Sequence, residues 1–198
     1  FFPFGVNIDS FEKVRLVVTE KPEEFKPIKK PIIGYIGGIH KWIDQNLVKS
    51  VCLGLPDFAF VFIGPIQTDI SLLSGIKNIF FLGSKEHGEL PSFVKFFSAA
   101  IIPYIISEYT KNVYPTKLNE YLAMGKPVVS TNLPEIVFFN QKHNNLVYTA
   151  PTSEEFISGI NTALKQDNGS LEEKRINAAR ENSWRNRIEQ MSIAIEQA

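Results

Sequence analysis

The sequence predicts an open, doubly wound parallel α/β sheet with helices on both faces. Short apolar segments alternate with segments of helical periodicity at least five times along the chain. The apolar segments are apolar throughout, as expected of strands that are buried on both faces of a parallel sheet. With 198 residues, the chain is long enough for one sizeable domain with its own core.

The domain is expected to span residues 31–198, after a connector at residues 1–30. Residues 21–27 are charged and interrupted by proline, which is typical of an exposed loop. The first predicted strand, residues 31–36, runs directly into Gly37-Gly38. A strand, a glycine turn and a helix form the geometry in which backbone amides can approach a phosphate closely.

The remaining elements follow from the same reading of apolar runs, periodicity and helix ends. Strands are predicted at residues 58–63, 79–83, 99–104, 128–129 and 145–148. Helices are predicted at residues 43–55, 89–97, 115–124 and 153–165, with Ser153 as an N-cap, and from residue 170 onward with a bend near 182–184. Pro115 suits a first helical position, and Gly125 suits the end of that helix.

The helix predicted from Pro115 lacks an obvious cap. Tyr114 has no side-chain acceptor in the right place, so the first amides, at Thr116 and Lys117, need an acceptor from elsewhere. A phosphate is the natural candidate, because a helix N-terminus carries partial positive charge and Lys117 adds a full one. Glu120, about one turn deeper, could accept hydrogen bonds from a ribose diol. The alternative is an ordinary surface helix with an ion pair between Lys117 and Glu120.

Residues 112–129 carry a longer pattern. They resemble the carboxyl-terminal half of retaining, GT-B-fold glycosyltransferases of the group 1, glycogen-synthase-like type. The signature of that family is Glu, seven residues, Glu, and then Ala-x-Gly-x-Pro-Val-Val. The run from Glu120 to Val129 fits it, whereas Asn112 stands at the position of the first Glu. The resemblance implies that Glu120 binds the ribose of a nucleotide sugar and that position 112 lies near the donor sugar.

The resemblance covers about residues 4–190 and implies further contacts with the donor. Residues 4–11 resemble the loop that opens the second domain of the family. The loop at Gly37-Gly38 would lie beside the diphosphate and donor sugar, with Lys41 as its basic residue and no Arg nearby. The residues after the strand at 79–83 would contact the nucleobase. The full set of candidate donor-binding residues is Gly37, Gly38, Lys41, Ser84, Lys85, Asn112, Tyr114, Thr116, Lys117 and Glu120; the catalytic residue is unassigned.

The function implied is donor binding in a transferase that moves a sugar from a nucleoside diphosphate sugar to an unspecified polysaccharide, lipid or small-molecule acceptor. No cofactor is expected, and no metal is needed if helix amides and basic side chains neutralise the diphosphate. A complete GT-B site needs an N-terminal domain that these residues do not supply, so the isolated domain is expected to be inactive. A non-catalytic binding module is the alternative, favoured by Asn112 and the missing Arg. A flavodoxin-like or response-regulator domain is disfavoured, because no acidic cluster follows the first strand.

Composition narrows the other possibilities. Lys plus Arg and Asp plus Glu are both 21, so no basic excess indicates nucleic acid as a partner. The single cysteine, Cys52, lies on an apolar helix face, fits a reducing compartment and is expected in the core. No apolar run approaches the roughly 20 residues of a membrane helix. The opening residues 1–5 lack a signal peptide's basic start and the chain does not begin with Met, so we expect a cytoplasmic fragment. A peripheral place at the inner membrane face is the alternative for the full-length protein.

Overall fold

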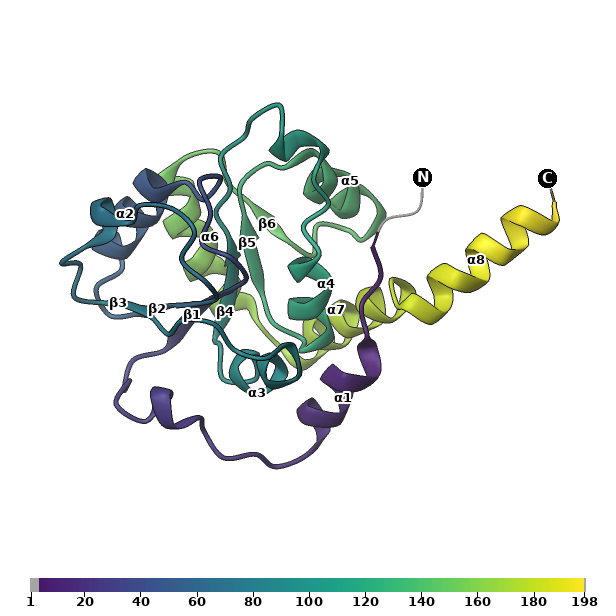
Figure 1. Cartoon of the computed structure of the whole chain (residues 1–198), viewed down its shortest axis with the longest axis horizontal. Coiled ribbons are helices and arrows are strands. Elements are labelled where there is room, and N and C mark those ends of the chain that lie inside the picture. The colour runs from purple at the N-terminus through teal and green to yellow at the C-terminus, as the bar shows by residue number, and fades with distance from the viewer. Residues whose placement is uncertain (1–3, 198) are drawn as a thin grey trace.

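The computed structural model describes residues 4–197. Its centre is a six-stranded sheet in the order β3-β2-β1-β4-β5-β6, in which every neighbouring pair of strands is parallel (Figure 1). The strands are β1 Ile32–Ile36, β2 Ala59–Ile63, β3 Ile79–Phe81, β4 Ala99–Ile102, β5 Val128–Ser130 and β6 Tyr148–Thr149. The predicted fold class, a doubly wound parallel sheet, is therefore confirmed.

Helices cover both faces of this sheet. Helices α2 and α6 pack together on one face, and α4 packs with α7 on the other, where α1 also lies against α3 and α4 (Figure 1). The α-helices are α1 Ile8–Leu16, α2 Gln45–Gly54, α3 Leu90–Val94, α4 Lys117–Ala123, α5 Pro134–Lys142, α6 Ser153–Gln166, α7 Gly169–Glu181 and α8 Trp184–Glu196. Single 3₁₀ turns occupy Glu23–Phe25, Ser71–Leu73, His87–Glu89 and Thr110–Asn112.

The core runs along the central strands. Every residue of β1, β2 and β4 is buried, which explains why their sequences are apolar throughout. Cys52, on α2, is fully buried, as predicted, and burial raises the pKa of its thiol to about 12, which makes the thiol unreactive at neutral pH.

The amino-terminal segment is more structured than the sequence suggested. The predicted connector contains helix α1, and Phe11 on that helix is buried against the domain. The prediction of an exposed loop at residues 21–27 is wrong at Phe25, whose ring is fully buried edge-on against Phe93 at a centroid distance of 5.4 Å. Burying a large aromatic ring stabilises the folded state by more than it costs to order the charged residues around the ring.

Two predicted helix starts are displaced. Helix α4 begins at Lys117 rather than Pro115, because the amides of Leu118 and Asn119 bond three residues back, to the carbonyls of Pro115 and Thr116, in a tight first turn. Helix α6 is capped by Thr152 rather than Ser153: the extended backbone of Thr152 lets its hydroxyl accept from the Glu155 amide at 3.2 Å. The helix predicted at residues 89–97 is also shorter, Leu90–Val94.

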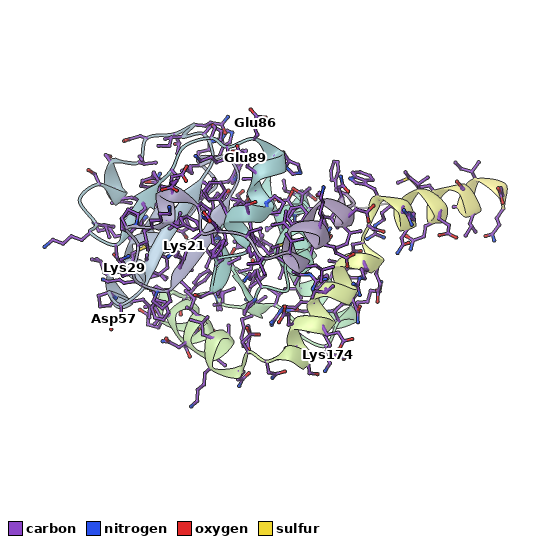
Figure 2. The ribbon with its side chains drawn as sticks, turned by 90° about the horizontal axis from the view of Figure 1, so that it is seen from below. Lys21, Lys29, Asp57, Glu86, Glu89 and Lys174 are labelled. Atoms are coloured by element: carbon purple, nitrogen blue, oxygen red, sulfur yellow. The ribbon has the colours of Figure 1, made fainter. Side chains whose placement is uncertain are left out.

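The predicted bend in the last helix is confirmed as a break between α7 and α8. Ser183 caps α8 by accepting from the Asn186 amide at 3.3 Å, and the opening segment pairs with the break through the Val6 amide and the Asn182 carbonyl at 3.0 Å. Beyond it, α8 extends away from the body of the molecule, and its described residues are not buried (Figures 1 and 2). The opening residues 1–3 lie outside the described part of the chain.

Across residues 4–197, none of the helices combines the length and the apolar character that crossing a membrane requires.

Candidate functional site

The candidate residues gather at the carboxyl ends of the strands, where the strand order reverses between β1 and β4. Gly37 follows β1, Tyr104 lies two residues beyond β4, and α4 begins nearby with Lys117. Loops on either side of such a switch point diverge, and the crevice between them is the usual ligand site of an open α/β sheet. The predicted convergence of the glycine loop and the start of α4 is confirmed by the contacts below.

The ammonium group of Lys117 lies directly over Gly37. Gly37 has a φ of 118°, and a Cβ atom at this position would lie 3.2 Å from Cε and 3.4 Å from Nζ of Lys117. Glycine is therefore required here for two reasons: the backbone conformation disfavours other residues, and the space above the backbone holds the lysine. The Gly37 amide donates to the Ile63 carbonyl at 2.8 Å and continues the β1–β2 pairing. The expectation that this amide faces a phosphate is therefore wrong.

Two buried tyrosines hold the Lys117 side chain, and we call Tyr35 and Tyr104 the tyrosine pair. Lys117 Nζ donates to the Tyr104 hydroxyl and lies 5.1 Å and 4.9 Å from the ring centroids of Tyr35 and Tyr104. The Tyr35 hydroxyl donates to the Gly38 carbonyl at 3.0 Å. Burial, with the nearby tyrosine hydroxyls adding to it, raises the pKa of Tyr35 far above its usual value, so Tyr35 remains a neutral donor.

The alternative of a surface ion pair between Lys117 and Glu120 does not hold. Within residues 4–197, the ion-pairing partner that faces Glu120 is His87, whose Nε2 lies 3.8 Å from the Glu120 Oε1 atom and pairs with it when the imidazole is protonated. The Glu120 side chain is only 17% exposed, whereas that of His87 is 69% exposed. Burial raises the pKa of Glu120, and the charges of His87 and Lys117 oppose that rise. Glu120 is thus a largely buried carboxylate in the first turn of α4.

The start of α4 is not capped by the loop before it. The Asn112 side-chain amide donates to the Glu108 carbonyl at 2.8 Å, and the Glu108 carboxylate accepts from Lys111 at 2.7 Å. In the described part of the chain, the amides of Thr116 and Lys117 have no hydrogen-bond acceptor. The prediction that these two amides lack an acceptor from the neighbouring loop is therefore confirmed.

Of the two residues expected to contact the nucleobase, Ser84 is exposed, whereas Lys85 makes contacts within the protein. Gly83 turns with a φ of 70° while its carbonyl accepts from the Gly64 amide at 2.8 Å, and Ser84 is exposed. Lys85 instead pairs with Glu24 of the amino-terminal segment and lies 5.3 Å from the Phe93 ring centroid. Its ammonium group is therefore turned toward the protein.

Two other candidate residues, Tyr114 and Lys41, make contacts other than those predicted for a donor site. Tyr114 is largely buried, and its hydroxyl donates to Oδ1 of Asn119 at 3.1 Å, so Tyr114 supports α4 from within. Lys41 is exposed at the rim of a separate cavity lined by Trp42, Ile105, Ser107 and Tyr109. The side chains nearest to Gly37 are Lys117 and Tyr35, so Lys117 supplies the positive charge that was sought at Lys41.

Several neighbours of the site were not predicted from sequence. The tyrosine pair and His87 belong to segments far from α4 in the chain, and Gln67 lies so close to Gly38 that a side chain there would collide with it. The sequence offers a signal only for His87, as a titratable residue in the loop after β3.

Comparison with known proteins decides the family. Residues 18–182 match the family model described as "Glycosyl transferases group 1". The chain belongs to this family. The predicted family is therefore confirmed, and the matched residues extend from the amino-terminal segment to the break between α7 and α8.

Individual relatives agree with that assignment. A protein of Bacillus subtilis (strain 168), TuaH, provisionally named a teichuronic acid biosynthesis glycosyltransferase, is 33% identical over 158 residues, which are 77% of this chain and 40% of the relative. The crystal structure of Anabaena Alr3699/HepE in complex with UDP and glucose has a TM-score of 0.74 at 14% identity, covering 100% of this chain and 56% of that one. Sucrose-phosphate synthase (tll1590) from Thermosynechococcus elongatus has a TM-score of 0.77 at 15% identity, covering 99% and 51%. The chain thus spans about half the length of these proteins.

Proposed function

We propose that this chain is the donor-binding domain of a retaining glycosyltransferase that moves a sugar from a nucleoside diphosphate sugar to an acceptor. The observation that carries the proposal is the Lys117 ammonium group over Gly37, next to amides of α4 that lack an acceptor. Charge and amide donors together suit a diphosphate, because the lysine supplies attraction and the amides supply geometry. The family of the chain supports this proposal, as does the structural similarity to Anabaena Alr3699/HepE, which was crystallised with UDP and glucose.

Each part of the donor has a proposed partner. The diphosphate would accept from the Thr116 and Lys117 amides and from Lys117 Nζ. The ribose would donate to Glu120, and His87 would help to keep that carboxylate ionised and oriented. The nucleobase would lie beside the exposed turn at Ser84.

The remaining candidates have weaker parts in this proposal. Gly38 lies next to Tyr35 and Gln67 and would border the donor sugar. Asn112 would face the sugar only if it releases the Glu108 carbonyl. Lys85 and Tyr114 are engaged within the protein and would act by supporting the neighbouring elements.

In the transfer itself, an acceptor oxygen forms a bond to C1 of the sugar while the bond from C1 to the diphosphate oxygen breaks. The nucleoside diphosphate leaves with the electron pair, and the acceptor proton passes to its phosphate oxygen. We propose that no cofactor or metal is needed, because Lys117 and the α4 amides can offset the charge on the leaving group. A second domain would complete the site, with the whole protein in the cytoplasm, at the inner membrane face if it is peripheral.

A non-catalytic binding module remains the second candidate. It is favoured by Asn112, which stands where the family signature has Glu and whose side chain is bonded to its own loop. Sugar transfer by the full-length protein would separate the two candidates, because a binding module would bind nucleotide without turnover. Because a second domain would be needed to complete the site, the 198-residue chain alone should bind nucleotide and transfer no sugar in either case.

Calorimetric titration of the chain with uridine, guanosine and adenosine diphosphates tests the proposal. One of them should bind, and Lys117→Gln should weaken that binding by about tenfold, as the loss of one charge-assisted hydrogen bond implies. Lys111→Gln is a matched control, because Lys111 is an exposed lysine that pairs with Glu108 outside the site. Binding that is equally sensitive to both substitutions, or absent for all three nucleotides, would refute donor binding.

A further inference from the structure

The amino-terminal segment holds the loop that follows β3 from outside. Lys85 in that loop donates a hydrogen bond to the Glu24 carboxylate, across 61 positions of the chain. We call this ion pair the latch. The Lys85 side chain is 21% exposed and that of Glu24 is 35% exposed, so water screens the pair only in part. The hydrogen bond from Lys85 is also the main reason that the pKa of Glu24 lies below its usual value.

Both ends of the latch lie against the same aromatic ring. Phe25, directly after Glu24, is fully buried, and its ring centroid lies 5.4 Å from that of Phe93. Lys85 Nζ lies 5.3 Å from the centroid of the same Phe93 ring. The backbone that carries Glu24 is therefore fixed by a core side chain, and the latch ties the loop to that fixed point.

Beyond Lys85 the loop closes into the tight 3₁₀ turn His87–Glu89, which is capped in both directions. The Glu86 amide donates to the Glu89 carboxylate at 2.9 Å, and the Glu86 side chain accepts from the Glu89 amide. Helix α3 follows directly from this turn. The turn is thus tied to the body of the domain at Lys85 on one side and at α3 on the other, and His87 lies between these two points.

His87 is the residue of this turn that meets the proposed donor site. Its Nε2 atom lies 3.8 Å from Glu120 Oε1, while 69% of its side chain is exposed. An imidazole with so much exposed surface is held in place mainly by the backbone that carries it. The distance between His87 and Glu120 is therefore set by the place of the turn, which the latch helps to fix.

We propose that the latch positions the nucleoside side of the donor site. Acting through Lys85, Glu24 sets the place of the turn, and the turn sets the distance from His87 to Glu120. The nucleoside role rests on the proposed function, whereas the placing of His87 by the latch does not. Neither residue of the latch needs to touch the nucleotide, so Glu24 and Lys85 act as positioning residues.

The chain has three histidines, His40, His87 and His143, so the place of His87 can be followed without a ligand. With ¹⁵N-labelled histidine, NMR follows the three imidazoles, and His87→Gln assigns the His87 signals. Glu24→Gln should shift the His87 signals and leave the other two imidazoles unmoved. Glu23→Gln is the matched control, because Glu23 lies in the same 3₁₀ turn as Glu24 but is exposed and pairs with a lysine of its own segment. It should shift none of the three.

Calorimetric titration with uridine, guanosine and adenosine diphosphates and with inorganic pyrophosphate tests the nucleoside role. Glu24→Gln should weaken binding of the preferred nucleotide about threefold to fivefold, the loss expected of a partly exposed ion pair, and Glu23→Gln should not. Pyrophosphate binding should be unchanged, because the tyrosine pair holds Lys117 at the phosphate side. Glu24→Lys should weaken nucleotide binding further, and its combination with Lys85→Glu should restore affinity to within about twofold of wild type. Identical circular dichroism spectra would confirm that the fold of each variant is intact.

The proposal is overturned if Glu24→Gln leaves the His87 signals in place, or if it weakens the binding of nucleotide and pyrophosphate equally. It is also overturned if Glu24→Gln strengthens nucleotide binding, because Lys85 would then be a nucleobase ligand that Glu24 holds back. The same conclusion follows if the exchanged charges do not restore affinity. The two proposals fail separately: nucleotide binding that is unaffected by Glu24→Gln refutes only the latch, whereas a His87 shift in a chain that binds no nucleotide refutes only the donor function.

Discussion

At the scale of single residues, the site depends on two charged groups, Glu120 and Lys117, that the protein holds in different surroundings. Lys117 is held over Gly37 by favourable contacts with the tyrosine pair, whereas Glu120 is a largely buried carboxylate whose pKa is raised by loss of solvent. Ionised Glu120 lowers the stability of the empty domain and becomes useful when a ligand satisfies it. Substitutions at these positions should therefore change stability and nucleotide affinity in different ways.

For Glu120→Gln we expect weaker nucleotide binding and a more stable empty domain. Because the folded pKa of Glu120 lies above that of the unfolded chain, the stability linked to its protonation is full below the unfolded pKa and is lost as pH rises through the folded pKa. The variant should therefore unfold at a higher temperature than wild type at pH 7, with a difference that shrinks toward pH 4. Nucleotide affinity at pH 7 should fall about 10- to 100-fold.

Calorimetry and thermal unfolding measure both effects. Unchanged nucleotide affinity would remove Glu120 from the site, and a lower unfolding temperature at pH 7 would show that its carboxylate is stabilised by the protein.

For Tyr104→Phe we expect a selective loss of affinity for the β-phosphate. The variant keeps the aromatic ring but removes the hydroxyl that receives Lys117 Nζ, so the ammonium group is held less well over Gly37. UDP affinity should fall about threefold to tenfold while UMP affinity stays unchanged, because UMP lacks the phosphate in question. Tyr148→Phe is the control, since its hydroxyl donates to Oε1 of Gln166 at the end of α6, at 2.8 Å and outside the site. Equal losses for UDP and UMP would indicate a general structural role instead.

The sequence predicted the site residues that lie close together in the chain and missed those that are far apart in it. Glu120 and Lys117 belong to one short helix whose spacing and uncapped start can be read locally. The tyrosine pair joins residues 69 positions apart, and nothing near Tyr35 or Tyr104 signals that contact. Lys85 and Lys41 were predicted from their positions in the family pattern alone. A linear pattern does not reveal that Lys85 pairs with Glu24 or that Lys41 is exposed at another cavity.

At the scale of elements, the position of α4 along the chain is set by the residues that end it more than by those that begin it. Gly125 closes the helix with a φ of 68°, and the Lys126 amide returns to the Tyr121 carbonyl at 3.0 Å. The sequence indicated this end through Gly125 and Pro127. It misplaced the start by two residues, because Pro115 is compatible both with a first helical position and with the extended residue before a tight turn.

Gly125→Ala should destabilise the domain by about 1–2 kcal/mol, because alanine disfavours the left-handed conformation at this position. A Cβ atom there would also lie 2.5 Å from Cγ of Glu172 on α7, which would have to move. Gly169→Ala is a matched control: Gly169 lies at the start of α7 and has open space where a Cβ would go, so that variant should be neutral or slightly stabilising. Urea unfolding compares them, and equal stability of the two variants would contradict the assigned role of Gly125.

At the scale of the whole molecule, α8 stands apart from the domain that precedes it. Its described residues are not buried, and Ile188, Ile193 and Ile195 expose large side chains along it. Figure 2 shows the helix extending from the body with side chains around it in open space. The sequence predicted a bend near residues 182–184, before α8, but not how little of that helix the domain itself would cover.

Removal of residues 189–198 should therefore change the free energy of unfolding by less than about 1 kcal/mol, because little surface buried on folding is lost. Removal from Trp184 onward should cost more, since the Trp184 ring packs edge-on against Phe4 at 6.3 Å and its backbone bonds to Val6. Calorimetric unfolding of the two truncated chains tests this difference. A large loss from the shorter truncation would show that α8 belongs to the core of the domain.

The donor site is tested most directly by a crystal structure of the chain with UDP bound. We expect the β-phosphate within hydrogen-bond distance of the Thr116 or Lys117 amide and of Lys117 Nζ, with the ribose hydroxyl groups on Glu120. The amide contacts should survive Lys117→Gln, because a lysine acts as a point charge while the amides define the geometry. A diphosphate bound away from α4, or an α4 start that Asn112 or Glu108 closes in the presence of UDP, would contradict the assignment of a nucleotide-sugar site.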